Sequence, residues 1–224
     1  MQIEFLVEDI SGRVLLEEVM KKYIAEEPAV DIGYTIFPYK GIGGFTKGSN
    51  VQNVKSQQLL TDLPKRMRAI QSTHYGRTDV AIFVVLDNDK RDTAVFEQQL
   101  KQTADRANIS MDHVFCIAIE EMEAWLLGDR AAMQRAYPEV ADRIATKSTG
   151  YVQDSICGTW EILADVLTKG GISSFRKKNP SSVDVGRSKS EWANNIGCRM
   201  NIRCNNSPSF QRFLQELDKR RELF

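Results

Sequence analysis

The stretch VAIFVVLDND, residues 80–89, decides the fold class. Its first seven residues are apolar and rich in β-branched side chains, which is typical of a strand buried on both faces of a parallel sheet. The run stops at Asp87, and a second acid, Asp89, follows two positions later. The stretch therefore predicts a central strand that carries two carboxylates at its carboxyl end.

Strand-like and helix-like segments alternate on either side of this stretch. Residues 3–7 and 30–37 are strand-like, and residues 114–119 form a second apolar run that ends at Glu120. Apolar side chains at helical spacing fall between and after these runs. The expected helices cover residues 14–23, which Ser11 would cap, residues 54–70, and residues 93–107. The alternation predicts an α/β fold, a mostly parallel sheet flanked by helices, over residues 1–130.

The second part of the chain, residues 131–224, shows helical patterns and no strong strand pattern. We expect it to form a helical C-terminal appendage packed on the α/β domain. Gly-, Ser- and Asn-rich stretches interrupt its helices, and residues 169–182 are the clearest of them. This stretch is expected to be a loop.

Composition limits the classes of function. The chain has 224 residues and 42% hydrophobic content, enough to fill a core. Its 30 Lys and Arg balance 30 Asp and Glu, so no overall field attracts nucleic acid or membrane. A polyanionic partner must therefore be held by local groups. No apolar stretch approaches the length of a membrane span, and we expect a cytoplasmic protein with no membrane contact.

Cysteine and histidine usage disfavours a zinc site. The cysteines are far apart in the sequence, none is part of a C-x-x-C pair, and the only histidines are His74 and His113. Widely spaced cysteines are compatible with reduced thiols in a cytosol. Any metal site is therefore expected to use oxygen ligands.

Acidic side chains follow three of the predicted strands. Glu8 and Asp9 come after the first, Asp87 and Asp89 after the third, and the acids of the stretch EEME, residues 120–123, after the fourth. The carboxyl ends of parallel strands share one edge of the sheet, where open α/β folds bind ligands. Grouped carboxylates repel one another unless a cation neutralises them, and Mg²⁺ prefers such oxygen ligands. The sequence therefore predicts a Mg²⁺ or Mn²⁺ site at this edge.

Each acid also has a structural interpretation. A carboxylate at the end of a strand can cap the next helix or face water, and Asp9 fits that role best because a helix starts beside it. Glu120 and Glu123, about one turn apart, can share a face, whereas Glu121 is expected to point elsewhere. The coincidence of three acidic strand ends is what favours a common site.

These residues carry a family resemblance. Val7-Glu8 and the stretch LDND, residues 86–89, resemble the Glu and D-x-D motifs of Toprim domains. The stretches AIEEMEAWLL, residues 118–127, and SPSFQRFL, residues 207–214, are similar to the bacterial family called domain of unknown function 4276. Together these motifs span most of the chain. One departure is Asp9, because Toprim domains usually place a glycine after their Glu, where the backbone approaches a phosphate.

The resemblance implies a function and a set of roles. Toprim domains occur in topoisomerases, primases and OLD-type nucleases, where the Glu transfers protons and the D-x-D acids hold Mg²⁺. By resemblance, Glu8 is the general acid or base, and Asp87 and Asp89 are catalytic metal ligands. Glu120 and Glu123, with Glu8 itself, complete the set of candidate metal ligands. A metal-dependent nuclease, active in phage defence and paired with an ATPase, is the expected function.

Basic residues that can contact nucleic acid are local. Lys90 directly follows the acidic pair, and Arg176, Lys177 and Lys178 follow Phe175 in the expected loop, which makes them candidate phosphate contacts. Two further local basic clusters lie at residues 65–68 and 187–189, and the first is more typical of a solvated helix face. The three tryptophans are expected to pack helices onto the sheet; they are Trp125, Trp160 and Trp192.

Two alternatives remain open. The same sheet can belong to a non-catalytic binding or regulatory protein that uses its acids for structure or partner contact. Strand-end aspartates with Mg²⁺ also serve phosphatases. The sequence does not choose between DNA and RNA, and it leaves the oligomeric state open.

Overall fold

The computed structural model describes residues 1–45 and 57–223, and its framework is a four-stranded sheet. All strand pairs are parallel, and the strand order is β2-β1-β3-β4. The strands are β1 (Gln2–Val7), β2 (Gly33–Pro38), β3 (Val80–Asp87) and β4 (Asp112–Ala118). The predicted α/β class and parallel sheet are confirmed, and the arrangement is consistent with a Toprim-like fold.

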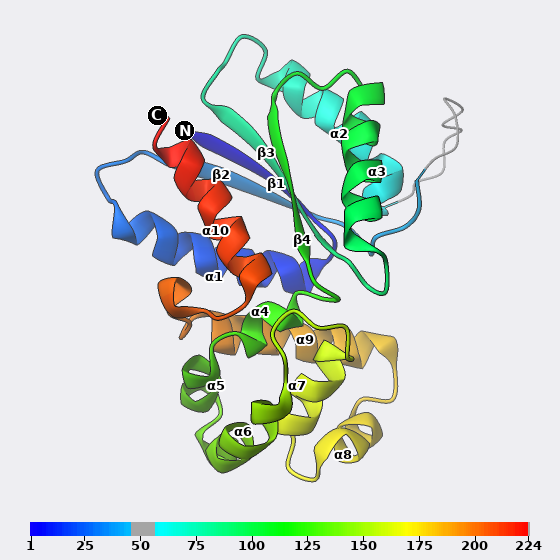
Figure 1. The fold of residues 1–224 in the computed structure, drawn as a ribbon, viewed down its shortest axis with the longest axis vertical. Coiled ribbons are helices and arrows are strands. Elements are labelled where there is room, and N and C mark those ends of the chain that lie inside the picture. The colour runs from blue at the N-terminus through cyan, green and yellow to red at the C-terminus, as the bar shows by residue number, and fades with distance from the viewer. Residues whose placement is uncertain (46–56, 224) are drawn as a thin grey trace.

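Helices cover both faces of the sheet (Figure 1). The first face packs against α1 (Ile10–Glu26) and α10 (Pro208–Arg221), and the second packs against α2 (Leu59–Thr73) and α3 (Thr93–Arg106). Strand β3 supplies Phe83 to the first face and Val84 to the second, both fully buried. This burial on both faces is what the unbroken apolar run predicts.

A lobe of short helices lies beyond the carboxyl ends of the strands (Figure 1). Its longest helix, α9 (Ser182–Gly197), packs along α1, where Trp192 and Ile196 join the core around Leu15. The lobe contains α4 (Glu123–Leu127), α5 (Arg130–Ala136), α6 (Ala141–Lys147), α7 (Thr159–Leu167), α8 (Gly171–Lys178) and α9 (Ser182–Gly197), with the short turns η1 (Pro138–Val140), η2 (Ser148–Gly150) and η3 (Ile202–Cys204).

The last helix, α10, returns to the sheet. Phe213 on this helix is fully buried, and its ring centroid lies 6.2 Å from that of Phe5 and 6.1 Å from that of Phe83. Arg220 donates hydrogen bonds to both carboxylate oxygens of Asp112 on β4. After β4 the described chain contains helices and no strand. The expected domain boundary at residue 130 stays a prediction.

Two local predictions were wrong. Asp9, not Ser11, caps α1, because its Oδ1 accepts a hydrogen bond from the backbone N–H of Gly12 at 2.7 Å. The expected loop at residues 169–182 contains α8, which begins after the left-handed glycine Gly170 and supplies Phe175 to the core. The predicted helix at residues 54–70 begins at Leu59 in the described part, and residues 46–56 lie outside the described residues.

Within residues 1–45 and 57–223, none of the helices combines the length and the apolar character that crossing a membrane requires.

Candidate functional site

The site centres on Glu8, which directly follows strand β1, and on Asp87, the last residue of the neighbouring strand β3. The chain leaves β1 toward β2 on one side and leaves β3 toward β4 on the other, so these strands flank the point where the strand order reverses. Open α/β sheets bind their ligands at this switch point. The sheet order therefore places the two carboxylates where a ligand is expected.

Backbone hydrogen bonds fix both side chains. The N–H of Asp87 donates to Oε2 of Glu8 at 3.2 Å, and the N–H of Met122 donates to Oδ1 of Asp87 at 2.9 Å. Among the described residues, Oε1 of Glu8 and Oδ2 of Asp87 accept no hydrogen bond. Each carboxylate is thus held by one oxygen and leaves the other free.

Burial makes ionisation of this pair costly. The pKa of Glu8 is raised to about 7, mainly by burial and also by the charges of Asp89 and Asp9, although the hydrogen bond from Asp87 opposes the rise. The pKa of Asp87 is raised well above its ordinary value by burial and by the charge of Glu8. The two groups therefore favour a bound proton or a nearby cation at neutral pH.

The cation that the fold itself supplies is Lys189, which sequence reasoning did not place in the site. This side chain comes from α9 in the helical lobe, and its Nζ lies 3.1 Å from Oε2 of Glu123 and 3.5 Å from Oε1 of Glu121. Burial lowers its pKa, but the charges of Glu123, Glu121 and Asp87 outweigh that effect and raise it overall. Lys189 therefore stays charged and joins the lobe to the acidic edge of the sheet.

The acids of residues 120–123 do not point in the directions that were predicted. Glu121 and Glu123, not Glu120 and Glu123, converge on Lys189. The expected pairing assumed a continuous helix, but Glu120 adopts a left-handed backbone with φ of 61° and α4 begins only at Glu123. Burial raises the pKa of Glu121 to about 7, and burial also raises that of Glu123.

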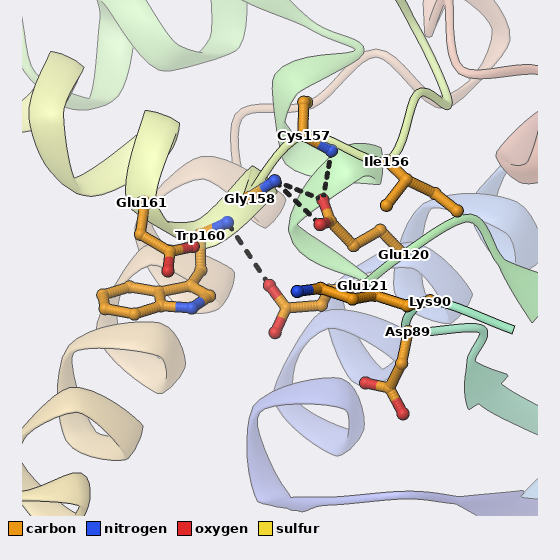
Figure 2. Close-up of a pocket in the computed structure, with 9 residues that line it drawn as sticks. All are labelled: Asp89, Lys90, Glu120, Glu121, Ile156, Cys157, Gly158, Trp160 and Glu161. Carbon is orange, nitrogen blue, oxygen red and sulfur yellow. Dashed lines mark hydrogen bonds between the residues drawn. The ribbon is translucent and has the colours of Figure 1, made fainter.

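Glu120 anchors the start of α7. Its Oε1 and Oε2 accept hydrogen bonds from the N–H of Gly158 at 2.7 and 2.9 Å, and Oε2 also accepts from the N–H of Cys157 at 3.2 Å (Figure 2). A further bond to Oε2 comes from the N–H of Thr159 at 2.8 Å. The otherwise unpaired N–H groups of a helix start are in this way satisfied by a carboxylate. Metal coordination by Glu120 stays a prediction, and it would require these bonds to break.

Asp89 lies at the edge of the site. Its backbone is left-handed, with φ of 50°, and its N–H donates to the carbonyl of Glu120 at 2.8 Å. Its carboxylate is 47% exposed and pairs with the guanidinium of Arg91. Its charge still contributes to the raised pKa of Glu8. Asp89 thus lies near Glu8 and Asp87, but its carboxylate is paired with Arg91.

A pocket of about 390 Å³ opens beside this edge, between the sheet and the lobe. Figure 2 shows Trp160 on one side of it, Ile156 on the other, and the side chain of Lys90 reaching between them. Trp125 and Trp192 are buried, as expected of packing residues, whereas Trp160 is only partly buried and faces this pocket. Sequence reasoning missed this second role of Trp160 because its position after Gly158 reveals nothing about exposure.

The predicted basic contacts lie apart from one another. Lys90 lines the pocket, whereas Arg176, Lys177 and Lys178 occupy the exposed last turn of α8 rather than a loop. Cations at that position also stabilise the helix by opposing its dipole. Arg176 links the two regions, because its guanidinium lies 6.0 Å from the centroid of the Trp160 ring.

The carboxylate oxygens at this site are of the type that a hard divalent cation prefers, but they are too few to surround a metal ion by themselves. Glu8 and Asp87 each offer one free carboxylate oxygen, and burial, with the repulsion of neighbouring carboxylates, raises the pKa of both although Lys189 opposes the rise. Within residues 1–45 and 57–223, however, no three His, Cys, Asp or Glu side chains are grouped closely enough to hold a metal ion. A cation bound here would rely on two carboxylates plus water or substrate oxygens, as Mg²⁺ often does.

Comparison with known proteins gives a family. The model of the family described as Domain of unknown function (DUF4276) matches residues 7–218. The chain belongs to this family. Searches of curated proteins and of solved structures gave no match.

The match to DUF4276 confirms the resemblance seen in residues 118–127 and 207–214. Its range includes Glu8, Asp87 and Lys189, so the whole acidic edge and the lobe that supplies its cation belong to the DUF4276 region. The description of the family assigns no activity, and function must be argued from the site.

Proposed function

We propose that this chain is a metal-dependent phosphodiesterase that cleaves nucleic acid, with its reaction centre at Glu8 and Asp87. The observation that carries the proposal is the pairing of two partly buried carboxylates at the switch point of a parallel sheet. Both have raised pKa values, a property that is common among reactive carboxyl groups. A kinship with Toprim domains and OLD-type nucleases is part of this proposal.

Each carboxylate has a role that follows from its free oxygen. Asp87 would hold Mg²⁺ or Mn²⁺ through Oδ2, since Oδ1 is engaged by Met122. When bound, the cation supplies polarisation of a phosphoryl oxygen and neutralises charge as the phosphodiester reacts. Glu8 would accept a proton from water at Oε1, and its pKa of about 7 suits a general base at neutral pH.

Neighbouring side chains support these roles. Asp89 would serve as a second ligand after its carboxylate turns from Arg91, a movement that its 47% exposure permits. In the absence of metal, the Lys189 ammonium would neutralise part of the negative charge of Glu121 and Glu123. It would also place a positive charge beside the bound phosphate. Lys90 lines the pocket and Arg176 lies 6.0 Å from the centroid of the Trp160 ring, and both exposed cations would contact the substrate backbone.

One observation favours a non-catalytic binding protein instead. Lys189 already neutralises part of the acidic edge and ties it to the helical lobe, as a purely structural ion pair would. A regulatory protein could keep such a network without any metal. This alternative predicts that neither Mg²⁺ nor Mn²⁺ produces cleavage.

The test is a cleavage assay on a panel of substrates. End-labelled single-stranded RNA and DNA, plasmid DNA and a small phosphate ester are incubated with the protein and Mg²⁺ or Mn²⁺. We expect nucleic acid to be cut by the parent and not by Asp87→Asn, which can still accept the hydrogen bond from Met122. Asp105→Asn, at an exposed position on α3, is the matched control and should cleave like the parent.

Three outcomes would contradict the proposal. Survival of every substrate favours the binding protein. Cleavage of the small ester alone indicates a phosphatase. Equal cleavage by Asp87→Asn and the parent excludes a mechanism that depends on the Asp87 carboxylate.

A further inference from the structure

The pocket beside the acidic edge offers a ligand two kinds of group. Its volume of about 390 Å³ lies at the small end of the roughly 300–1,000 Å³ range of small-ligand sites. Trp160 is partly buried and supplies an aromatic surface, and Ile156 is 50% exposed and supplies an aliphatic one. Such surfaces together favour a flat, weakly polar group.

The acids that line the pocket are already engaged. Glu120 is bonded to the start of α7, and Glu121 accepts bonds from Thr159 and from the N–H of Trp160 at 3.2 and 3.3 Å. Asp89 pairs with Arg91, and Glu161 lies 3.9 Å from Arg176. Each of the four carboxylates in the lining therefore has a partner within the protein, which leaves less of their charge to attract a cationic ligand.

Lys90 is the exception. Its side chain is exposed and reaches across the pocket (Figure 2), and it has no ion-pair or hydrogen-bond partner among the described residues. An unpaired ammonium beside an aromatic surface suits a ligand that has both a negative charge and a flat ring. A nucleotide unit has both, whereas an isolated phosphate lacks the ring and a basic peptide lacks the negative charge.

We propose that this pocket is a nucleotide subsite in which an unpaired base stacks on Trp160 and its phosphate contacts Lys90. The inference rests on the proposed function, because it assigns the pocket to the substrate that Glu8 and Asp87 cleave. Arg176 extends the subsite, since its guanidinium lies 6.0 Å from the Trp160 ring and it is 62% exposed toward solvent. A base inside a duplex cannot reach such a surface without unstacking, so the preferred substrate is single-stranded.

Binding without metal tests the subsite separately from catalysis. A short fluorescein-labelled strand of mixed sequence, as DNA and as RNA, is titrated with the protein in EDTA, both alone and annealed to its complement. Fluorescence anisotropy gives the affinity. We expect the single strand to bind more tightly than the duplex, and Trp160→Leu to weaken its binding roughly five- to a hundredfold, the usual loss on removing one stacking platform.

Four other variants complete the design. Trp160→Tyr keeps an aromatic ring and should restore most of the binding. Lys90→Ala should weaken binding a few-fold and reduce its salt dependence by about one phosphate contact. The controls Tyr75→Leu and Lys101→Ala remove an exposed ring, 91% accessible, and an exposed cation at other sites, and both should bind like the parent.

Several outcomes would overturn the subsite. They are equal affinity of the parent for duplex and single strand, no binding of either, or a folded Trp160→Leu that binds like the parent. If Trp160→Leu does not fold, the exposed Lys90→Ala decides, and unchanged affinity in that variant overturns the proposal. Binding through Trp160 without any cleavage by the parent in Mn²⁺ contradicts the nuclease proposal alone. If the parent cleaves nucleic acid but Trp160→Leu binds it as tightly as the parent does, only the subsite proposal is contradicted.

Discussion

The backbone N–H of Asp87 donates a hydrogen bond to the Glu8 carboxylate at 3.2 Å, and this contact joins the ends of two adjacent parallel strands. The donor belongs to the residue whose own carboxylate repels Glu8. The fold thus holds two like charges together through the backbone while burial raises the pKa of both. A site built in this way costs stability unless a proton or a cation is bound.

Glu8 contributes to the pH dependence of stability, alongside Asp87 and Glu121, whose pKa values are also raised. Its pKa is about 7 in the folded chain against an ordinary 4.5, so between these values the folded state keeps a proton that the unfolded state has lost. The free energy of unfolding should therefore fall as pH rises from about 5 to about 8 in EDTA. Glu8→Gln, which can still accept the bond from Asp87, should flatten this fall and raise Tm at the upper end, by about 2–4 °C for each kcal/mol gained.

Thermal unfolding at several pH values measures this effect. Glu139→Gln, at an exposed position, is the control and should follow the parent. Added Mn²⁺ should raise the parent Tm more at high pH than at low pH, because protons bound to Glu8 and Asp87 remove the negative charge that attracts the cation. Parallel Tm curves for the parent and Glu8→Gln would show that Glu8 has no raised pKa.

Lys189→Met removes the cation that compensates the acidic edge. Breaking a largely buried ion pair leaves unpaired charge, and we expect a loss of about 2–4 kcal/mol in the free energy of unfolding at neutral pH, measured in urea. Adding Glu123→Gln should restore part of this loss, because the stranded carboxylate is then neutral. The exposed Lys101→Met is expected to change stability by less than about 0.5 kcal/mol. A similarly small effect at Lys189 would mean that the cluster does not depend on it.

The variant Glu120→Ala tests whether Glu120 anchors the start of α7 or binds a metal ion. The substitution leaves the N–H groups of Cys157, Gly158 and Thr159 without their acceptor and should cost about 1–3 kcal/mol. Hydrogen exchange should increase first at the start of α7, while Mn²⁺ affinity stays near that of the parent. Loss of Mn²⁺ binding at unchanged stability would instead make Glu120 a ligand.

Phe213→Ala tests whether α10 belongs to the sheet layer. Its ring is fully buried against Phe5, Phe83 and Trp125, so truncation should cost about 3–5 kcal/mol in urea unfolding. Leu223→Ala, at a side chain that is 73% exposed, should have little effect. A single unfolding transition at lower urea is expected for Phe213→Ala. A separate early transition that leaves the sheet intact would make α10 a dispensable appendage.

The sheet was predictable because its signals are local. Residues 80–86 form an apolar run that only burial on both faces explains, and the acids at Glu8 and Asp87 mark strand ends directly. Parallel pairing then brings those ends to one edge whatever the loops between them do. The strand order, which makes that edge a switch point, depends on packing of the helices and was not visible in the sequence.

The partners of the acids were not predictable in the same way. Lys189 lies 66 residues beyond Glu123 in the numbering and reaches it only because α9 packs along α1. Glu121, not the expected Glu120, joins Glu123 at Lys189 because the backbone of Glu120 is left-handed, and helical periodicity in the sequence cannot reveal such a residue. Likewise, the Gly-rich composition around Gly170 hid α8, because a glycine that starts a helix resembles one in a loop.

The most direct measurement is a calorimetric titration of Mn²⁺ into the parent and into the double variant Glu8→Gln/Asp87→Asn at a pH above 7. Both substitutions keep an acceptor for the backbone hydrogen bonds and remove the charges, so the fold should persist while the oxygen ligands lose their affinity. We predict saturable binding to the parent that is lost in the double variant. No heat of binding to the parent, or equal binding to both proteins, would contradict a cation site at Glu8 and Asp87.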